Sequence, residues 1–465
     1  MGAEFAFQPV RELARRIRSG ETRPTELAEY FLDRLGRLGS AYNALVTLTR
    51  ERALREAAEA EAELGAGRDR GLLHGIPYGA KDLLAAAGYP TTWGAAPFRE
   101  QRFDYDAAVI RRLREAGAVL VGKLATVELA GGMGYTQPDA AFTGAGKNPW
   151  NPEFWSGGSS NGPGSAVAAG LVPFALGTET WGSIITPSAF CGVSGLRPSF
   201  GRVSRFGAMP LSWSLDKVGP MGLTADDCGI VLEAIAGPDP ADPTTVDRPF
   251  RWEPPDPGRR FRVGVLKGAA ENAQPEVAQN FEASLRVLAE FCALEEVELP
   301  DLPFNGLAGT ILFAEAGSVF EDFITSGRVA ELTAPEDRYR PYVYLVVPAK
   351  DYLRALRLRK KAVRLLNGLF DPYDAVVSPS RLTVAGRVDQ DFRTYFPPRT
   401  AGVPISAAEN VAGLPGISVP NGFGQNGLPT GIQFTGAAFA EERILGVAHA
   451  YQLRTDWHRR HPPVG

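Results

Sequence analysis

The alternation of hydrophobic and polar positions predicts helices at the start of the chain. The segment that begins at Val10 has apolar residues at positions i, i+3 and i+7, the spacing of one buried helix face. Thr25 precedes a second run of the same kind, and we expect it to cap that helix. The charged run 50–64 is most simply a solvated helix face. We therefore expect residues 9–65 to be helical.

Further along the chain, short apolar runs rich in β-branched residues alternate with helical patterns. This alternation is typical of an α/β protein. In the last predicted helix, the basic residues of 354–364 are interspersed with Leu and Ala, which favours an amphipathic surface helix over a site for an anionic partner. The predicted strands are 118–122, 261–265 and 375–378, and the predicted helices are 277–292 and 346–368.

Composition excludes several classes of protein. A net charge of -4 argues against a nucleic-acid surface. Cys191, Cys228 and Cys292 are an odd, widely spaced set, which indicates neither a disulfide framework nor a metal site. The first residues lack the pattern of a signal peptide, and no apolar run of about 20 residues follows, so we expect no membrane contact and a cytoplasmic location.

A Gly/Ser-rich region holds two candidate nucleophiles, Ser159 and Ser183. The Gly-x-Ser-x-Gly match at 158–162 does not follow a predicted strand, so it lacks the context of a nucleophile elbow. The region contains neither a P-loop nor a dinucleotide-binding pattern. The match to the latter at 422–427 is followed by Leu-Pro-Thr where a helix should start, so we interpret it as a turn.

A serine nucleophile needs a base, and histidine is scarce in this chain. His449, His458 and His461 cluster in the last 17 residues, and His74 precedes an extended segment. A Ser-His-Asp site is therefore weakly supported, although it stays open.

Lys81 is the second candidate base. Apart from Asp82, its flanks are uncharged, and burial can lower a lysine pKa from about 10.4 towards about 7. On Lys81 alone, an ordinary lysine paired with a carboxylate is the simpler interpretation.

The serine regions 155–170 and 178–187, together with Lys81, resemble the Ser, cis-Ser, Lys triad of the amidase signature family. The family implies Ser183 as nucleophile, Ser159 as a proton relay after a cis peptide bond, and Lys81 as base. Backbone N–H groups of Thr180, Trp181, Gly182 and Ser183 would form the oxyanion hole. Other matching pieces, in the family's order, are 73–77, 121–123, 148–150, 190–198, 201–204, 216–221 and 412–420.

The resemblance also implies the architecture, a central mixed β-sheet covered on both sides by helices. We divide a single domain, 1–465, into N-terminal helices 9–65, a catalytic core 66–236, a surface connection 237–260 and the remaining core 261–465. The connection is rich in Pro and Asp, but matching pieces resume beyond it. A chain of this length can bury one large core.

Four positions depart from the family's pattern: Asn161, Glu179, Trp181 and Ile185 stand where Gly, Asp, Gly and Arg are usual. Trp181 would either strain its turn, if the position needs a positive φ, or line the acyl pocket with an aromatic face. The missing arginine at Ile185 removes up to five donors that would brace the loop.

The favoured function is hydrolysis of small amides, aryl amides or carbamates through an acyl-enzyme, without cofactor or metal. Met133, Tyr135, Trp181 and the 395–398 segment would give an apolar pocket. The alternatives are the glutaminase subunit of a tRNA-dependent amidotransferase and a non-catalytic scaffold with the same fold. We expect a small-molecule partner only, and a monomer or homodimer.

Overall fold

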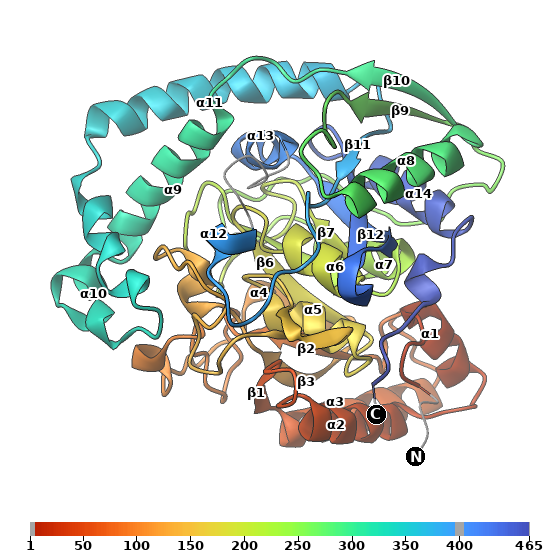
Figure 1. Ribbon diagram of the computed structural model, residues 1–465. Coiled ribbons are helices and arrows are strands. Elements are labelled where there is room, and N and C mark those ends of the chain that lie inside the picture. Colours follow the sequence, from red (N-terminus) through yellow and green to blue (C-terminus); the bar gives the residue numbers. More distant parts are fainter. Residues whose placement is uncertain (1–4, 396–403, 465) are drawn as a thin grey trace.

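A large mixed β-sheet runs through the centre of the molecule (Figure 1). The computed structural model describes residues 5–395 and 404–464, and within them the sheet has 11 strands in the order β1-β3-β2-β6-β8-β7-β12-β13-β11-β9-β10. A separate hairpin pairs β4 with β5. The strands are β1 Leu45–Leu48, β2 Pro77–Lys81, β3 Val119–Leu124, β4 Lys147–Asn148, β5 Asn151–Trp155, β6 Phe174–Glu179, β7 Ser194–Arg197, β8 Lys217–Gly222, β9 Phe261–Leu266, β10 Cys292–Val297, β11 Ala375–Pro379, β12 Gly416–Phe423 and β13 Pro429–Thr435.

Helices surround the sheet, as the family resemblance implied (Figure 1). The long helix α11 crosses one end of the molecule, and the first and last residues described lie near each other at the other end. The helices are α1 Val10–Arg18, α2 Pro24–Leu38, α3 Arg50–Gly65, α4 Ala108–Glu115, α5 Asn161–Ala168, α6 Ile185–Cys191, α7 Ala225–Ile235, α8 Pro275–Ala289, α9 Phe304–Val319, α10 Glu321–Thr325, α11 Ala349–Phe370, α12 Phe392–Tyr395, α13 Pro404–Ala412 and α14 Glu441–Gln452.

Strand β6 separates two hydrophobic cores. Phe174 and Leu176 point into the core formed with α1, α4, α7 and α14, while Ala175 between them points into the core formed with α2, α3 and α5. Alternate residues of a strand face opposite sides of a sheet. Both faces of the sheet are therefore buried, which explains why its central strands are almost uninterrupted apolar runs.

Parallel pairing places two strand ends together. β2 lies between β3 and β6 and is parallel to both. The carboxyl ends of β2 and β6 therefore open at the same edge, where ligands bind in many open α/β sheets. Lys81 ends β2 and Thr178 lies near the end of β6.

Most predicted elements are present, but three strands contradict the sequence analysis. β5 lies directly before the Gly-x-Ser-x-Gly match at 158–162, where no strand was expected, although it pairs only with β4 outside the main sheet. β1 interrupts the region 9–65 that was predicted to be all helical. β10 begins at Cys292, where the predicted helix 277–292 was still continuing. β10 is an edge strand that exposes Glu295 and Glu296, so its sequence lacks the apolar run of a central strand. The interpretation of 422–427 as a turn is confirmed, since these residues include the end of β12 and the loop that joins it to β13.

Two expectations for the N-terminal helices were wrong. Thr25 does not cap α2, because the helix begins at Pro24 after Arg23, and the Thr25 hydroxyl instead donates to Glu61 at 2.5 Å. The charged run 50–64 is helical but not wholly solvated. Arg52 and Glu56 are buried, with 2.7 Å between Nε of Arg52 and Oε1 of Glu56.

The connection 237–260 runs between α7 and β9. Phe250 and Trp252 anchor it in the core, and Nε1 of Trp252 donates to Asp226 at 2.9 Å. Its place inside a single domain stays a prediction.

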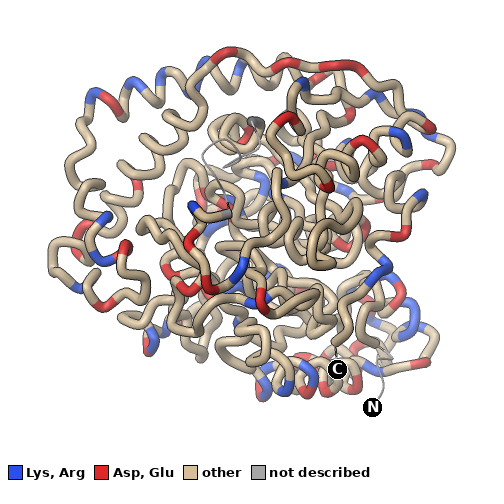
Figure 2. The backbone as a smooth tube through the Cα atoms, in the orientation of Figure 1, with Lys and Arg blue, Asp and Glu red and all other residues tan. Residues whose placement is uncertain are grey.

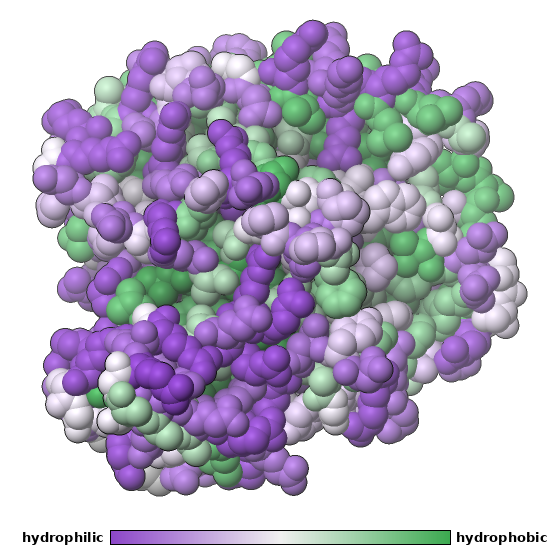
Figure 3. Space-filling model, turned by 180° about the vertical axis from the view of Figure 1, so that it is seen from behind, coloured by the Kyte–Doolittle hydropathy of each residue, from purple (hydrophilic) through white to green (hydrophobic). Residues whose placement is uncertain are grey.

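The surface carries both signs of charge, distributed over the outer helices (Figure 2). Figure 3 shows a mostly hydrophilic face with smaller hydrophobic patches between polar residues. Among the described residues, we find no helix with the length and apolarity needed to span a bilayer.

Candidate active site

Lys81 lies at the end of β2 and is completely buried. Its Nζ lies 2.8 Å from Oγ of Ser159, 3.0 Å from Oγ of Ser160 and 2.9 Å from Oγ1 of Thr178. The lysine predicted as base and the serine predicted as relay are therefore in direct contact, although 78 positions separate them in the chain.

Burial holds the pKa of Lys81 well below its ordinary value of 10.5, while the negative charges of Asp216 and Glu179 oppose this shift. The neighbouring Asp82 does not pair with Lys81. Its carboxylate binds Lys123, with 2.7 Å between Nζ of Lys123 and Oδ1 of Asp82. The ordinary interpretation, a buried lysine in an ion pair, therefore fits Lys123, and Lys81 is surrounded by hydroxyl groups instead.

Ser159 follows a cis peptide bond, Gly158-Ser159, as the family resemblance implied. Its carbonyl accepts from the N–H of Val127 at 3.1 Å, and the N–H of the next residue, Ser160, donates to the carbonyl of Ser183 at 3.2 Å. The second of these hydrogen bonds joins the two serine segments. Their side chains are thus positioned by backbone contacts and not by sequence proximity.

Ser183 lies in the turn between β6 and α6. The residue before it, Gly182, has φ of 89°, a conformation that favours glycine. Trp181 is not among the described residues with positive φ, so the strain considered for this position is absent. The proposed oxyanion turn therefore accommodates the tryptophan without backbone cost.

Glu179 braces the same turn from inside. Its Oε2 accepts from the backbone N–H groups of Ile184 at 2.8 Å and Ile185 at 3.0 Å. Its Oε1 lies 2.8 Å from a nitrogen of Arg197, which also binds Glu409 at 2.8 Å. Ile185 stands where the family usually has an arginine, and only its backbone N–H binds Glu179. The guanidinium that pairs with Glu179 comes instead from Arg197 of β7.

A second carboxylate holds the other side of the turn. The hydroxyl of Thr180 donates to Oδ1 of Asp216 at 2.5 Å, and Oδ2 of Asp216 accepts from the N–H groups of Leu211 and Ser212. The turn 180–183 is therefore fixed on both sides. Thr180 binds Asp216 before it, and the backbone of Ile184 and Ile185 binds Glu179 after it.

Sequence reasoning missed these supporting residues. Asp216 lies in one of the pieces that carry the resemblance, 216–221, and Arg197 lies in another, 190–198. The only available signal was that a charged residue stands inside an otherwise apolar, strand-like piece. Thr178 gave no signal beyond its place two residues before Thr180.

Asn161, another departure from the family's pattern, opens α5 and is buried. Among the described residues, neither Oδ1 nor Nδ2 of its side chain has a hydrogen-bond partner. A buried polar group without a partner costs about 1–3 kcal/mol. Nothing in the structure explains what this residue contributes.

The predicted pocket residues lie in three different environments. Met133 is completely buried in a hydrophobic cluster with Leu83 and Leu211. Tyr135 is half-buried and makes an edge contact with Phe392, with ring centroids 5.2 Å apart. Trp181 is half-buried and packs against the cluster that contains Leu215. The 395–398 segment lies outside the described residues, apart from the backbone of its first residue.

The other candidate nucleophiles and bases are located elsewhere. His74 is completely buried between Glu63 and the backbone N–H of Arg70. The remaining three histidines line a cavity that does not include Lys81, Ser159 or Ser183.

The cysteines are not candidate nucleophiles. Burial raises the thiol pKa of all three, to about 12 for Cys292, so the thiols stay protonated. Among the described residues, no group of three or more His, Cys, Asp or Glu side chains is arranged to hold a metal ion.

Comparison with known proteins decides the family. The model of the family described as Amidase matches residues 26–445. The chain belongs to the amidase family. Enzymes of this family hydrolyse C–N bonds, and the chain is an amide-bond hydrolase of this class.

Three kinds of protein resemble the chain over nearly its whole length. A glutamyl-tRNA(Gln) amidotransferase subunit from Thermosynechococcus vestitus is 36% identical over 488 residues, with 98% of this chain and 99% of the relative covered. The native peptide amidase of Stenotrophomonas maltophilia has a TM-score of 0.85 at 32% identity and 99% coverage of both chains. A bacterial aryl acylamidase, 21% identical, has the same fold, with a TM-score of 0.83 and 98% of both chains covered.

Proposed function

We propose that Ser183 is the nucleophile, that Ser159 relays its proton, and that neutral Lys81 is the base. The observation that carries this proposal is the contact of the completely buried Lys81 amine with three hydroxyl oxygens. A base must have a lone pair, and burial favours the neutral amine by lowering the pKa of Lys81.

The hydrogen bonds around Lys81 support proton transfer from the Ser159 hydroxyl to the Lys81 amine. A neutral amine has two N–H donors and one lone pair. The Ser160 hydroxyl donates to the carbonyl of Thr178 at 3.2 Å, so towards Lys81 it acts as an acceptor. We assign the second N–H of the amine to the Thr178 hydroxyl, which leaves the lone pair of Lys81 to accept from Ser159.

The reaction follows from this arrangement. Oγ of Ser183 bonds to the substrate carbonyl carbon while its proton passes to Oγ of Ser159, and the proton of Ser159 passes to Nζ of Lys81. When the C–N bond breaks, the proton returns through Ser159 to the leaving nitrogen. Water then attacks the acyl-enzyme by the same route, which releases the acid and restores Ser183.

The negative charge that forms on the carbonyl oxygen needs donors. We assign this role to the backbone N–H groups of Thr180, Trp181, Gly182 and Ser183. Their turn is braced by Asp216 and Glu179, so little reorganisation is needed during reaction. Removing one such donor typically costs about 10²-fold to 10³-fold in kcat.

The substrates we propose are small amides, aryl amides or carbamates with an apolar acyl or leaving group. The supporting observations are the half-buried rings of Tyr135 and Trp181, and the likeness to a peptide amidase. Met133 enters the proposal only as a packing residue, because it has no exposed surface.

A second candidate function is the glutaminase subunit of a tRNA-dependent amidotransferase. The observation in its favour is that curated relatives at 34–37% identity are glutamyl-tRNA(Gln) amidotransferase subunits that match this chain in length. In this role, the same triad would release ammonia from glutamine while partner subunits use it.

An activity panel distinguishes these functions. The purified chain is given an anilide, an aryl carbamate, an aryl ester and glutamine. We expect turnover of the anilide or carbamate, reduced at least about 10²-fold by Lys81→Ala and unchanged by Lys350→Ala on the surface. Turnover of glutamine only with added partner subunits supports the second candidate, and no turnover of any compound contradicts both.

A further inference from the structure

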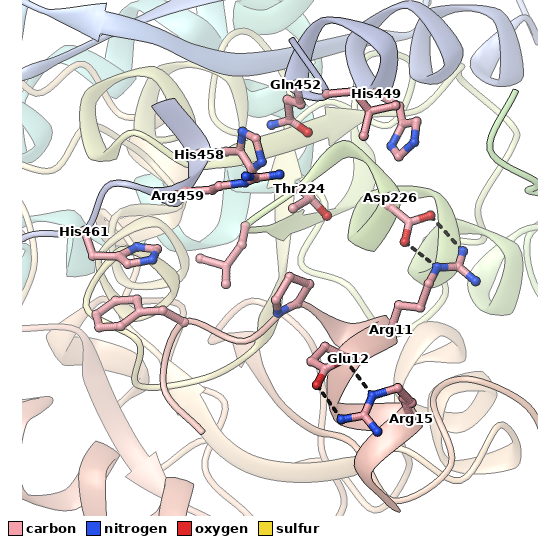
Figure 4. A pocket seen from close by; sticks show the side chains of 14 residues that line it. Arg11, Glu12, Arg15, Thr224, Asp226, His449, Gln452, His458, Arg459 and His461 are labelled. Carbon is pink, nitrogen blue, oxygen red and sulfur yellow. Dashed lines mark hydrogen bonds and ion pairs between the residues drawn. The ribbon is translucent and has the colours of Figure 1, made fainter. Parts of the chain in front are cut away.

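Three of the four histidines of the chain, His449, His458 and His461, line a single cavity (Figure 4). Its volume is about 790 Å³. The cavity lies between α1, the start of α7, the end of α14 and the residues after it, so it joins the two ends of the chain. Lys81, Ser159 and Ser183 are not among its lining residues, and the mechanism uses none of its side chains.

One part of the lining is apolar. Phe7, Pro9, Leu223 and Leu453 contribute hydrophobic surface. The ring of Phe7 is stacked on the imidazole of His461, with centroids 4.1 Å apart and planes inclined by 14°. This contact holds the N-terminal segment against the C-terminal residues. The cavity therefore has a defined apolar wall where a hydrophobic group can be buried.

The other part of the lining has an excess of one positive charge. Arg11 is occupied by Asp226 through two hydrogen bonds of 2.8 Å. Arg15 is likewise occupied by Glu12, at 2.8 Å. Among the described residues, no carboxylate pairs with Arg459, a solvent-exposed residue that lines the cavity and is labelled beside His458 in Figure 4. This guanidinium is available to an incoming anion.

The imidazoles add neutral hydrogen-bonding groups. Burial lowers the pKa of His458 to about 4 and also lowers the pKa of His449 and His461, so all three are neutral at pH 7. Nδ1 of His458 is buried without a hydrogen-bond partner among the described residues. Figure 4 shows the His458 ring beside the Arg459 guanidinium, with Gln452 above them. A polar ligand atom placed here meets several donors at once.

We propose that this cavity binds a small monocarboxylate with an aromatic or branched apolar body. The single unpaired guanidinium matches one carboxylate, which arginine binds through two parallel hydrogen bonds. A dianion such as a phosphate monoester exceeds the single excess positive charge of the lining. The volume lies within the range of about 300–1,000 Å³ found for small-molecule sites. The proposal stands on this cavity alone and does not depend on the proposed function.

Phenylacetate is a suitable probe, with 2-phenylethanol as the uncharged compound of the same body. We expect saturable binding of phenylacetate to the full chain by calorimetry, at least about tenfold tighter than that of 2-phenylethanol. Arg459→Gln should weaken phenylacetate binding at least about tenfold, the effect of about 1.4 kcal/mol. Arg460→Gln is the matched control, because Arg460 pairs with Asp456 outside the cavity.

The histidines give a second readout on the intact protein. In a spectrum of ¹³C-labelled imidazoles, phenylacetate should shift the signals of His449, His458 and His461. The signal of His74, buried in another part of the fold, should stay fixed. The proposal is overturned if no saturable binding occurs up to about 10 mM. It is equally overturned if Arg459→Gln binds as well as the unmodified chain, or if the three signals do not move, since phenylacetate then binds elsewhere.

Discussion

Glu179 and Arg197 form an ion pair that is completely shielded from solvent, with 2.8 Å between Oε1 of Glu179 and Nη1 of Arg197. The pair links two ends of strands, β6 and β7, that flank β8 in the sheet. Because the other oxygen of Glu179 binds the N–H groups of Ile184 and Ile185, the ion pair also positions the turn that contains Ser183.

Glu179→Gln should destabilise the protein by about 3 kcal/mol at pH 7, because it leaves a buried guanidinium short of charge compensation. The pKa of Glu179 is lowered to about 2, chiefly by Arg197 and Lys217 against the cost of burial, compared with 4.5 ordinarily. A lowered carboxyl pKa stabilises the fold fully above pH 4.5 and progressively less as the pH falls towards 2. The difference in unfolding free energy between variant and unmodified protein should shrink over that range.

Urea unfolding at several pH values measures this effect. The matched control is Glu233→Gln, whose partner Arg251 is largely exposed, and we expect a change within about 0.5 kcal/mol. Equal effects of the two substitutions would contradict the role assigned to the buried pair.

Ser183→Ala should abolish covalent labelling by a fluorophosphonate probe, which otherwise adds one equivalent to the protein. The reason is that only a serine next to a proton relay is nucleophilic enough to react. Ser188→Ala, in the helix α6 that follows Ser183, is the control and should be labelled as before. Mass spectrometry gives the stoichiometry, and persistent labelling of Ser183→Ala would disprove the assignment.

Asp216→Asn should move the acidic limb of the kcat/KM profile to lower pH. Lys81 must be neutral to act as base, so activity falls when the pH drops below its pKa. The negative charge of Asp216 raises that pKa, and its removal therefore lowers it. Thr180→Val separates charge from geometry, because it removes the hydrogen bond between Thr180 and Asp216 and leaves the carboxylate. It should lower kcat without moving the limb, and a shift in both variants would argue against the electrostatic role.

Trp181→Gly tests whether the ring of Trp181 contacts the acyl group. If it does, the variant should favour bulkier acyl groups, with relative kcat/KM changed about tenfold or more, equivalent to about 1.4 kcal/mol. If the ring only packs against the cluster around Leu215, the variant should lose about 3–5 kcal/mol of stability and keep its substrate ranking. A substrate series and a melting curve on one preparation distinguish these results.

Much of the proposed catalytic assembly could be picked out from the sequence because its parts are local in sequence. The serine segments, the lysine and the turn glycine each stand within a short run of matching residues. The supporting network could not be predicted in the same way. Arg197 binds Glu409 across 212 positions, and nothing in either segment indicates the other as its partner. Only the pairing of β7 with β12 brings these regions together.

Predictions from local sequence patterns were also wrong where other parts of the fold contact the segment. Thr25 has the residue type of a helix cap, but Pro24 opens the helix and the hydroxyl binds Glu61 from α3. In the charged run 50–64, Arg52 and Glu56 have the spacing of a surface pair. Both are buried because the fold places Asp106 and the backbone of Leu120 against them.

The sequence by itself determined the family and the α/β class, and it singled out Lys81, Ser159 and Ser183 as the proposed triad, because these depend on residue types in short segments. Only the tertiary structure decided that Lys81 is surrounded by hydroxyl groups while Lys123 takes the carboxylate of Asp82. It also decided that three histidines near the C-terminus share a cavity with the first helix. The physical reason is that the pKa and the partners of a side chain depend on what the fold packs around it, and those groups come from distant parts of the chain.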